Sequence, residues 1–143
     1  MATRTAEATL NLAAIAPVVD RYFTGFNAED YHAVADLFGA DGVLFAPFED
    51  PIVGAEAVYT YLQAEAIAMR ATPLEAEVTP MSGEDQSLPE DGIQQVVVNG
   101  RVKTLLFSVS VRWTFVLTAA NTIRSAEIKL LASLQELMAF DRG

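Results

Sequence analysis

Hydrophobic residues recur at three- and four-residue steps through the first half of the chain, which is the spacing of one face of an α-helix. Residues 10–26 follow this spacing and predict a helix with Tyr22 on its apolar side. After a break, a new start predicts a second, shorter helix from Tyr31 to Gly39. The same period predicts a third helix over residues 58–69.

A turn and a short strand are predicted between the second and third helices. Asp41-Gly42 is a turn signal. The β-type run that follows, Val43–Ala46, is brief because Pro47 and Pro51 interrupt it.

Alternation of apolar and polar residues replaces the helical period in the second half of the chain. The middle strand is the clearest, because its odd-numbered positions are apolar and its even-numbered positions are mostly polar; the apolar set is Val109, Val111, Trp113, Phe115 and Leu117. Alternation is loose over 74–81, and a mobile polar connection is predicted over 82–92. Strands are predicted over 93–106, 108–118 and 122–132, and a hairpin at 119–122 joins the last two. A short helix is predicted over 134–140.

Helices followed by a long antiparallel sheet indicate an α+β fold in which the helices cover one face of the sheet. A sheet that curves around the N-terminal helices would make a cone with an apolar interior, which resembles the nuclear-transport-factor-2-like (NTF2-like) fold. We expect one domain over residues 1–143, since neither an internal repeat nor a linker is visible. Residues 1–12 are expected to be mobile or to cover a face of the sheet.

Composition narrows the classes of function. Nine Lys and Arg residues against 19 Asp and Glu give a net charge of −10, and the basic residues are scattered along the sequence. Nucleic acid and anionic membranes are therefore unexpected partners, because both need clustered positive charge. No cysteine is present, no apolar run reaches about 18 residues, and the first residues lack a secretion signal. We expect a soluble cytoplasmic protein.

Catalytic chemistry finds little support in the residues. The single histidine, His32, is expected on the surface of a short helix, so neither a metal site nor a Ser-His-Asp arrangement is predicted. On the last strand, Glu127 shares the polar side with Ser125 and Lys129 rather than facing the interior. No catalytic residue is assigned, although an isomerase- or cyclase-like enzyme acting on a small apolar substrate stays open as the alternative.

Two neutral hydrogen-bond donors are predicted to face the apolar interior. Tyr22 comes from the first helix and Trp113 from the middle strand. A phenol O–H and an indole N–H can both point at one carbonyl oxygen without adding charge, which suits a ketone on a long hydrocarbon. The competing interpretation is that both are ordinary core aromatics.

Six stretches of the chain resemble the C-terminal domain of the orange carotenoid protein and, more closely, stand-alone homologues of that domain. The resemblance covers roughly residues 15–140. The stretches are Arg21–Ala28, Leu37–Val43, Ala46–Gly54, Val102–Thr104, Arg112–Phe115 and Leu130–Leu137.

The resemblance implies a non-enzymatic carrier of a ketocarotenoid of the canthaxanthin or echinenone type, with a photoprotective or antioxidant role. In that family a tyrosine on the first helix and a tryptophan on the sheet bind the keto oxygen, and the matching residues here are Tyr22 and Trp113. The remaining tunnel residues implied by the alignment and the strand pattern are Met69 at the end of the third helix, Ile128 and Leu130 on the last strand, and Val111 and Phe115 beside Trp113.

The resemblance also implies partners. A carotenoid is about twice as long as one such domain can enclose, so a homodimer that shares one pigment is expected. Helical carotenoid proteins are expected as pigment donors or acceptors, with transient membrane contact during pigment uptake. The helical N-terminal domain of full-length members has no counterpart in this sequence, so we expect no light-triggered domain separation. Leu105-Leu106-Phe107 stands where the family has a second tryptophan, so the family's contacts to the pigment ring at that end are not carried over.

Overall fold

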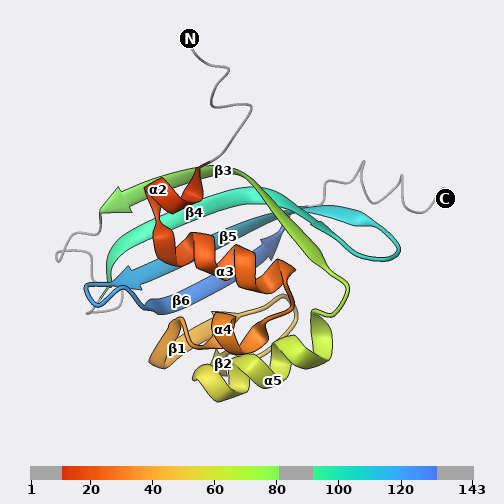
Figure 1. The fold of residues 1–143 in the computed structure, drawn as a ribbon, viewed down its shortest axis with the longest axis horizontal. Coiled ribbons are helices and arrows are strands. Elements are labelled where there is room, and N and C mark those ends of the chain that lie inside the picture. The colour runs from red at the N-terminus through yellow and green to blue at the C-terminus, as the bar shows by residue number, and fades with distance from the viewer. Residues whose placement is uncertain (1–10, 81–91, 132–143) are drawn as a thin grey trace, which may run out of the picture.

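A six-stranded, strongly twisted sheet forms the body of the protein (Figure 1). The computed structural model describes residues 11–80 and 92–131. The strands lie in the order β2-β1-β6-β5-β4-β3, and their bounds are β1 Phe38–Phe45, β2 Ile52–Val53, β3 Arg70–Pro80, β4 Gly92–Lys103, β5 Ser108–Thr118 and β6 Ile123–Leu130. The α+β class and the curved sheet predicted from the sequence are confirmed.

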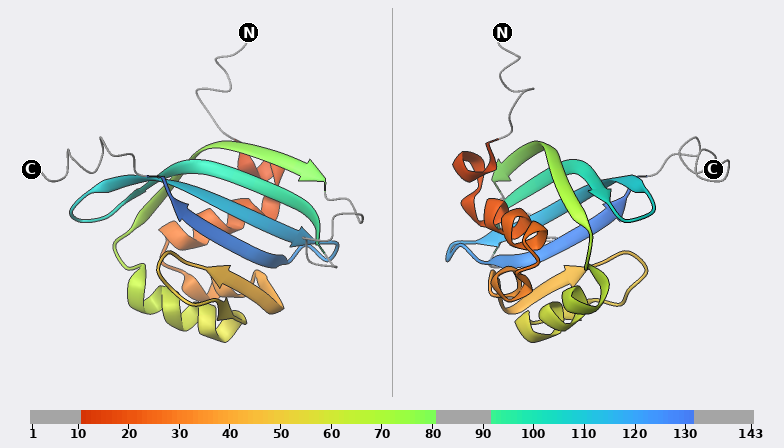
Figure 2. Two further views of the ribbon diagram at one scale, coloured as in Figure 1. Left: turned by 180° about the vertical axis from the view of Figure 1, so that it is seen from behind. Right: turned by 45° about the vertical axis from the view of Figure 1, so that its right-hand side comes forward.

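Four helices are described: α2 Leu12–Ile15, α3 Pro17–Asn27, α4 Tyr31–Ala35 and α5 Ala55–Glu65. Helix α3 crosses one face of the sheet, and α4 and α5 lie next to β1 and β2 (Figure 1). The view from behind shows no described element over the other face of the sheet (Figure 2). None of the described helices is long and apolar enough to span a lipid bilayer.

The first predicted helix is interrupted at Ala16, whose extended backbone separates α2 from α3. The cause is Pro17, which has no N–H to donate and is favoured in the first turn of a new helix. Asn11 caps α2 by accepting a hydrogen bond from the Ala14 N–H at 3.2 Å, and Leu12 is buried. Residues 11 and 12 therefore belong to the domain, whereas the segment before them lies outside the described residues.

The second helix ends at Ala35 rather than Gly39, so its predicted end is wrong. Strand β1 begins at Phe38 and runs through Asp41-Gly42, which is a bulge in the strand and not a hairpin turn. A Cβ at Gly42 would lie 2.7 Å from the carbonyl oxygen of Ile123. Glycine thus permits the close approach of β1 to β6, and this pairing is parallel although the rest of the sheet is antiparallel.

The third helix ends at Glu65, so the prediction that it reaches Met69 is also wrong. Ala68 takes a positive φ of 69°, which a continuing helix cannot accommodate. The chain then enters β3, where the sequence showed only loose alternation. The predicted connection at 82–92 lies almost wholly outside the described residues, and the predicted helix at 134–140 lies wholly outside them.

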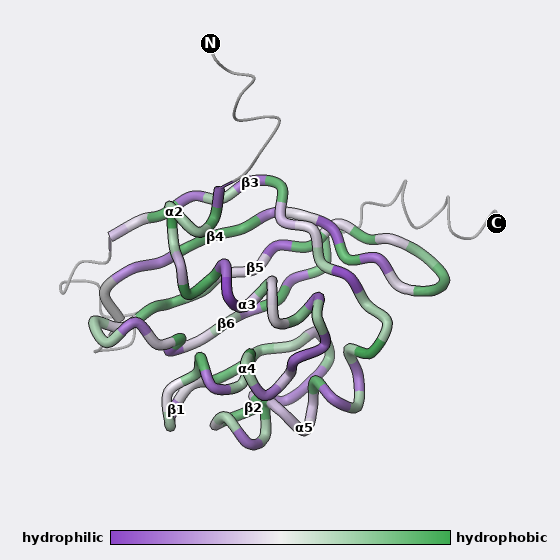
Figure 3. Tube along the Cα trace, viewed as in Figure 1, coloured by the Kyte–Doolittle hydropathy of each residue, from purple (hydrophilic) through white to green (hydrophobic). Residues whose placement is uncertain are grey.

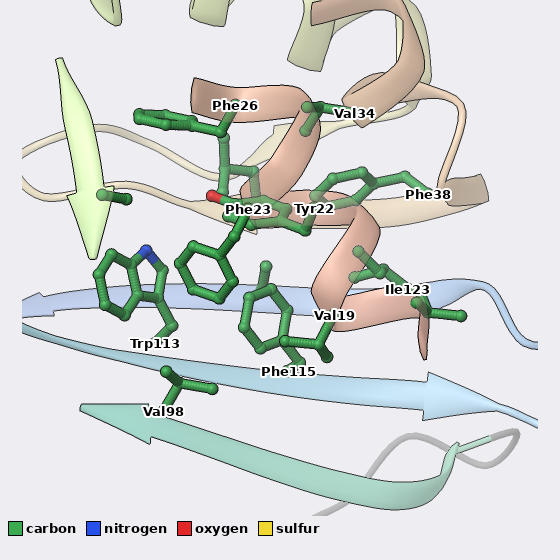
Figure 4. Close-up of a cluster of buried hydrophobic side chains, with 14 of the residues drawn as sticks. Val19, Tyr22, Phe23, Phe26, Val34, Phe38, Val98, Trp113, Phe115 and Ile123 are labelled. Carbon is green, nitrogen blue, oxygen red and sulfur yellow. The ribbon is translucent and has the colours of Figure 1, made fainter. Parts of the chain in front are cut away.

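The core lies between α3 and the concave face of β4, β5 and β6 (Figure 4). Its centre is a set of perpendicular aromatic rings: Tyr22 with Phe115 at 5.0 Å and Phe23 with Trp113 at 4.8 Å between ring centroids. Edge-to-face contacts of this kind stabilise a core beyond simple area burial. They also fix the orientation of both predicted donor side chains.

Candidate binding site

A largely apolar cavity of about 280 Å³ opens between α3, α5 and the sheet. Six of the seven residues predicted for the tunnel line it, namely Tyr22, Met69, Val111, Trp113, Ile128 and Leu130. The other lining residues are Phe26, Pro47, Tyr61, Leu62, Glu65, Ala66, Val102, Thr104, Phe107 and Val109. The structure thus brings residues from distant parts of the chain together around one cavity.

Tyr22 contributes the one lining hydroxyl that is fully buried without a hydrogen-bond partner among the described residues. Its side chain is only 1% exposed. Burial raises the pKa of Tyr22 far above the ordinary value of 10.0, and the neighbouring Tyr61 adds to the rise. The hydroxyl is therefore neutral at every physiological pH and can donate one hydrogen bond.

Trp113 presents a second neutral donor to the same cavity. Its ring is buried, and it packs at 90° against Phe23. Figure 4 shows the Tyr22 hydroxyl oxygen and the Trp113 indole nitrogen turned toward the same side of the aromatic cluster. The structure thus places two neutral donor side chains in the wall of one largely apolar cavity.

Phe115 is the predicted tunnel residue that does not line the cavity. It is fully buried behind the cavity wall, where its ring contacts Tyr22 and Phe23. Met69 does line the cavity, but from the loop between α5 and β3 rather than from a helix. Leu130 lies at the mouth, with 43% of its surface exposed.

The mouth also contains residues that were not predicted from the sequence. Glu65, at the end of α5, is an exposed carboxylate on the rim, and Tyr61 lies one helical turn before it. Burial raises the pKa of Tyr61, and the charges of Glu49 and Glu65 add to this rise. The spacing of Tyr61 and Glu65, four residues apart on one helix, is the signal that would have identified both.

The two remaining candidates from the sequence lie away from the cavity. His32 is exposed on α4, and its ring stacks on Tyr59 at 3.8 Å. Glu127 is exposed on the outer face of β6, as alternation predicted. Within residues 11–80 and 92–131, no group of three or more His, Cys, Asp or Glu side chains comes together that could hold a metal ion.

Comparison with known proteins supports the resemblance predicted from the sequence. The model of the SnoaL-like domain family matches residues 7–121. The orange carotenoid-binding protein of Synechocystis is 34% identical over 125 residues, which is 85% of this chain and 37% of that protein. This chain therefore spans a little over a third of the length of that relative.

Solved structures of other proteins support the same resemblance. The orange carotenoid protein of Anabaena (Nostoc) sp. PCC 7120 binding canthaxanthin has a TM-score of 0.71 and 32% identity, covering 85% of this chain and 38% of that one. A Sinorhizobium meliloti protein assigned as a polyketide cyclase has a TM-score of 0.64 and 20% identity, covering 84% of this chain and all of that one. An NTF2-like protein from Cytophaga hutchinsonii has a TM-score of 0.60 and 11% identity, with coverages of 85% and 91%. The last two share the fold alone, and together these matches confirm the NTF2-like fold and the resemblance to orange carotenoid protein.

Proposed function

The chain belongs to the SnoaL-like domain family, and within it we propose that this protein binds one end of a ketocarotenoid without catalysing a reaction on it. The observation that carries the proposal is the buried Tyr22 hydroxyl in an apolar cavity, which has no hydrogen-bond partner within the described part of the chain. A buried hydroxyl without a partner costs stability, so a ligand that accepts its hydrogen bond recovers that free energy. A keto oxygen provides such an acceptor, and Trp113 supplies the second donor.

The lining residues fit the rest of a carotenoid end. Apart from Glu65 and Thr104, the cavity is lined by aliphatic and aromatic side chains, Met69 and Pro47. Apolar contact with these residues would supply most of the affinity, because each hydrogen bond contributes only about 0.5–1.5 kcal/mol net. The relative from Anabaena is a protein that binds canthaxanthin, which is a carotenoid with keto groups.

The size of the cavity supports sharing of the ligand between two copies. About 280 Å³ lies just below the roughly 300–1,000 Å³ range of small-molecule sites. A whole carotenoid does not fit, so its second half must leave through the mouth. A homodimer with facing mouths would enclose both ends, and the two copies would make equivalent contacts.

The wider role follows from the same ligand. We propose that the protein carries the pigment in the cytoplasm, exchanges it with helical carotenoid proteins, and protects against light and singlet oxygen through the bound pigment. Light-driven domain separation is not included, because the matched region is about a third of the relative's length.

The alternative is a cyclase- or isomerase-like enzyme with a small apolar substrate. The shared fold with the S. meliloti protein and the carboxylate of Glu65 on the cavity wall favour it. However, Glu65 is exposed at the rim, whereas an acid–base catalyst is expected deep in the cavity, where burial shifts its pKa. We therefore favour the carrier.

Reconstitution tests the proposed function. Purified protein is incubated with canthaxanthin or with a hydrocarbon carotenoid and then separated by size exclusion with visible detection and light scattering. We expect canthaxanthin to co-elute with a species of twice the 15.4 kDa chain mass, at one pigment per two chains, and to be recovered chemically unchanged. Failure of canthaxanthin to bind contradicts the proposal; binding to a monomer contradicts the shared arrangement, and a converted pigment supports the enzyme.

A further inference from the structure

The hairpin between β4 and β5 projects beyond the rest of the domain and ends in an apolar tip (Figures 1 and 3). The tip, residues 104–107, is Thr-Leu-Leu-Phe. Leu105 is 86% exposed and Leu106 is 88% exposed. Two adjacent leucines held almost fully in water at the end of a hairpin are unfavourable for an isolated domain, and they indicate a contact surface.

Hydrogen bonds within the tip pair several of its backbone groups. The Thr104 Oγ1 accepts from the N–H groups of Leu106 and Phe107, each at 3.1 Å. The Thr104 N–H and hydroxyl both donate to the Phe107 carbonyl oxygen, at 2.8 and 3.1 Å. Each polar group that is paired within the turn lowers the cost of moving the turn into an apolar medium.

The tip adjoins the mouth of the cavity. Thr104 and Phe107 line the cavity themselves, so the two leucines lie between two lining residues. Other exposed apolar side chains occur on the segments that form the mouth, namely Phe48 beside Pro47, Ile67 between Ala66 and Met69, and Leu130 on the wall. The apolar interior thus continues onto the surface at this end.

Strand pairing brings basic residues together beside the tip, although they are scattered in the sequence. Lys103 pairs with Arg70, Arg112 pairs with Lys129, and Arg101 lies between these two rows. All five side chains are exposed, and they are five of the nine Lys and Arg residues of the chain. These basic residues lie in the three rows of paired, outward-facing strand residues that are nearest the tip. Among the described residues of these three rows, Glu75 is the only acidic one.

We infer that the β4–β5 hairpin tip docks the protein onto anionic lipid bilayers, with Leu105 and Leu106 inserted and the five basic residues at the level of the headgroups. An apolar tip flanked by Lys and Arg is the pattern of a protein that lies at the membrane interface and inserts about 5–10 Å. Adjacent residues of a strand are about 3.3 Å apart, so Lys103 and Arg70 would lie at headgroup depth when the leucines are inserted.

A lipid surface fits this tip better than a second protein surface. A stable protein interface buries about 800 Å² on each partner, whereas the projecting tip offers a few side chains. The cavity lining also includes the exposed carboxylate of Glu65, at the end of α5, which anionic lipid repels. The hairpin therefore approaches the bilayer first, and the protein is tilted.

Docking places the cavity mouth next to the hydrocarbon of the bilayer. If the proposed function holds, an apolar pigment could pass between the bilayer and the cavity with little exposure to water. This second step rests on the proposed function, whereas docking itself requires no pigment.

Flotation of pigment-free protein with vesicles tests the inference. The vesicles are phosphatidylcholine with or without about a third phosphatidylglycerol, at low and at physiological salt. We expect binding to the anionic vesicles, weakened by salt, and a loss of at least tenfold in partitioning for Leu105→Ser/Leu106→Ser. Leu74→Ser removes an exposed leucine from β3, and it should bind as the wild type does.

Charge reversal gives an independent test. Lys103→Glu should lower binding to the anionic vesicles, whereas Arg21→Glu, an exposed position on α3, should change it much less. Thermal unfolding followed by circular dichroism checks that every variant is folded.

Wild-type protein that binds neither kind of vesicle overturns the inference. A folded Leu105→Ser/Leu106→Ser variant that binds vesicles as the wild type does also overturns it. The same holds if that variant differs from the wild type only in its self-association. A wild-type protein that docks but takes up no canthaxanthin from the vesicles supports the docking inference and contradicts the proposed function.

Discussion

The side chain of Asn27 holds the backbone of Ala71 through two hydrogen bonds: its Nδ2 donates to the Ala71 carbonyl oxygen at 2.8 Å, and its Oδ1 accepts from the Ala71 N–H at 2.7 Å. The carboxylate of Glu29 accepts from the Ala68 N–H at 2.9 Å. Together these bonds tie the end of α3 to the loop between α5 and β3. Because that loop carries Ala66 and Met69, its attachment fixes part of the cavity wall.

Asn27→Ala should lower the free energy of unfolding by about 1–3 kcal/mol, because it leaves both partly buried polar groups of the Ala71 backbone without their side-chain partner. Urea denaturation measures the change. Asn99→Ala is the matched control, since Asn99 makes exposed side-chain bonds to Glu75 and Arg112, and its loss should cost less than about 0.5 kcal/mol. Equal losses of unfolding free energy in the two variants would show that the Asn27 bonds stabilise the protein no more than exposed side-chain bonds do.

Tyr22→Phe should stabilise the pigment-free protein by about 1 kcal/mol, because it removes a buried hydroxyl that has no partner among residues 11–80 and 92–131. Tyr31→Phe should do the same, since the Tyr31 hydroxyl is also buried without a partner in the described structure but does not line the cavity. Urea denaturation of both variants checks this. Only Tyr22→Phe should also weaken canthaxanthin binding; a loss of stability in both would indicate that the hydroxyls are paired in solution.

Stability should fall as the pH rises above about 10. Burial raises the pKa of Tyr22 in the folded protein, and the pKa values of Tyr31 and Tyr61 are raised as well. Below pH 10 both the folded and the unfolded chain keep these protons, so their pKa shifts contribute nothing there. Above it the unfolded chain releases protons that the folded chain retains, and unfolding is favoured.

The slope of the unfolding free energy against pH shows whether Tyr22 is responsible for the decline. One such group changes the free energy of unfolding by up to about 1.4 kcal/mol per pH unit. Urea denaturation between pH 9 and pH 11 should therefore give a shallower decline for Tyr22→Phe than for the wild type. Identical slopes would mean that the Tyr22 hydroxyl ionises as readily in the folded protein as in the unfolded chain.

Gly100→Ala should be strongly destabilising, by about 1–3 kcal/mol or more. A Cβ at Gly100 would lie 2.1 Å from the carbonyl oxygen of Thr72 and 2.9 Å from the Cα of Pro73, both of which are backbone atoms. At Gly39 an added Cβ would lie 3.5 Å from the nearest side-chain atom, so Gly39→Ala is the control. Thermal unfolding compares them, and similar melting temperatures would show that β3 moves away without cost.

Strands β4, β5 and β6 and the inner face of β5 were predictable because alternation is a local signal. Trp113 and Val111 fall on that face in the sequence and in the structure. Tyr22 was predictable in the same way from the helical period of α3. These residues come from long, regular elements, in which position along the chain decides which way a side chain points.

What the sequence did not reveal depends on contacts between distant segments. The parallel pairing of β1 with β6 is set by the close approach at Gly42, and no local pattern encodes it. The same holds for the basic cluster beside the hairpin tip, which arises only when Arg70, Lys103 and Lys129 are aligned by strand pairing. Met69 was identified through resemblance, although the helix predicted to carry it ends four residues earlier.

The visible absorption spectrum of bound canthaxanthin tests the central claim most directly, with the wild type compared with Tyr22→Phe and Trp113→Phe. A hydrogen bond to the keto oxygen draws electron density along the conjugated chain and lowers the excitation energy. We expect the wild type to absorb at the longest wavelength, each variant to be blue-shifted with modestly weaker binding, and a hydrocarbon carotenoid to show no such difference. Identical canthaxanthin spectra for all three proteins would contradict the claim that Tyr22 and Trp113 hold the keto oxygen.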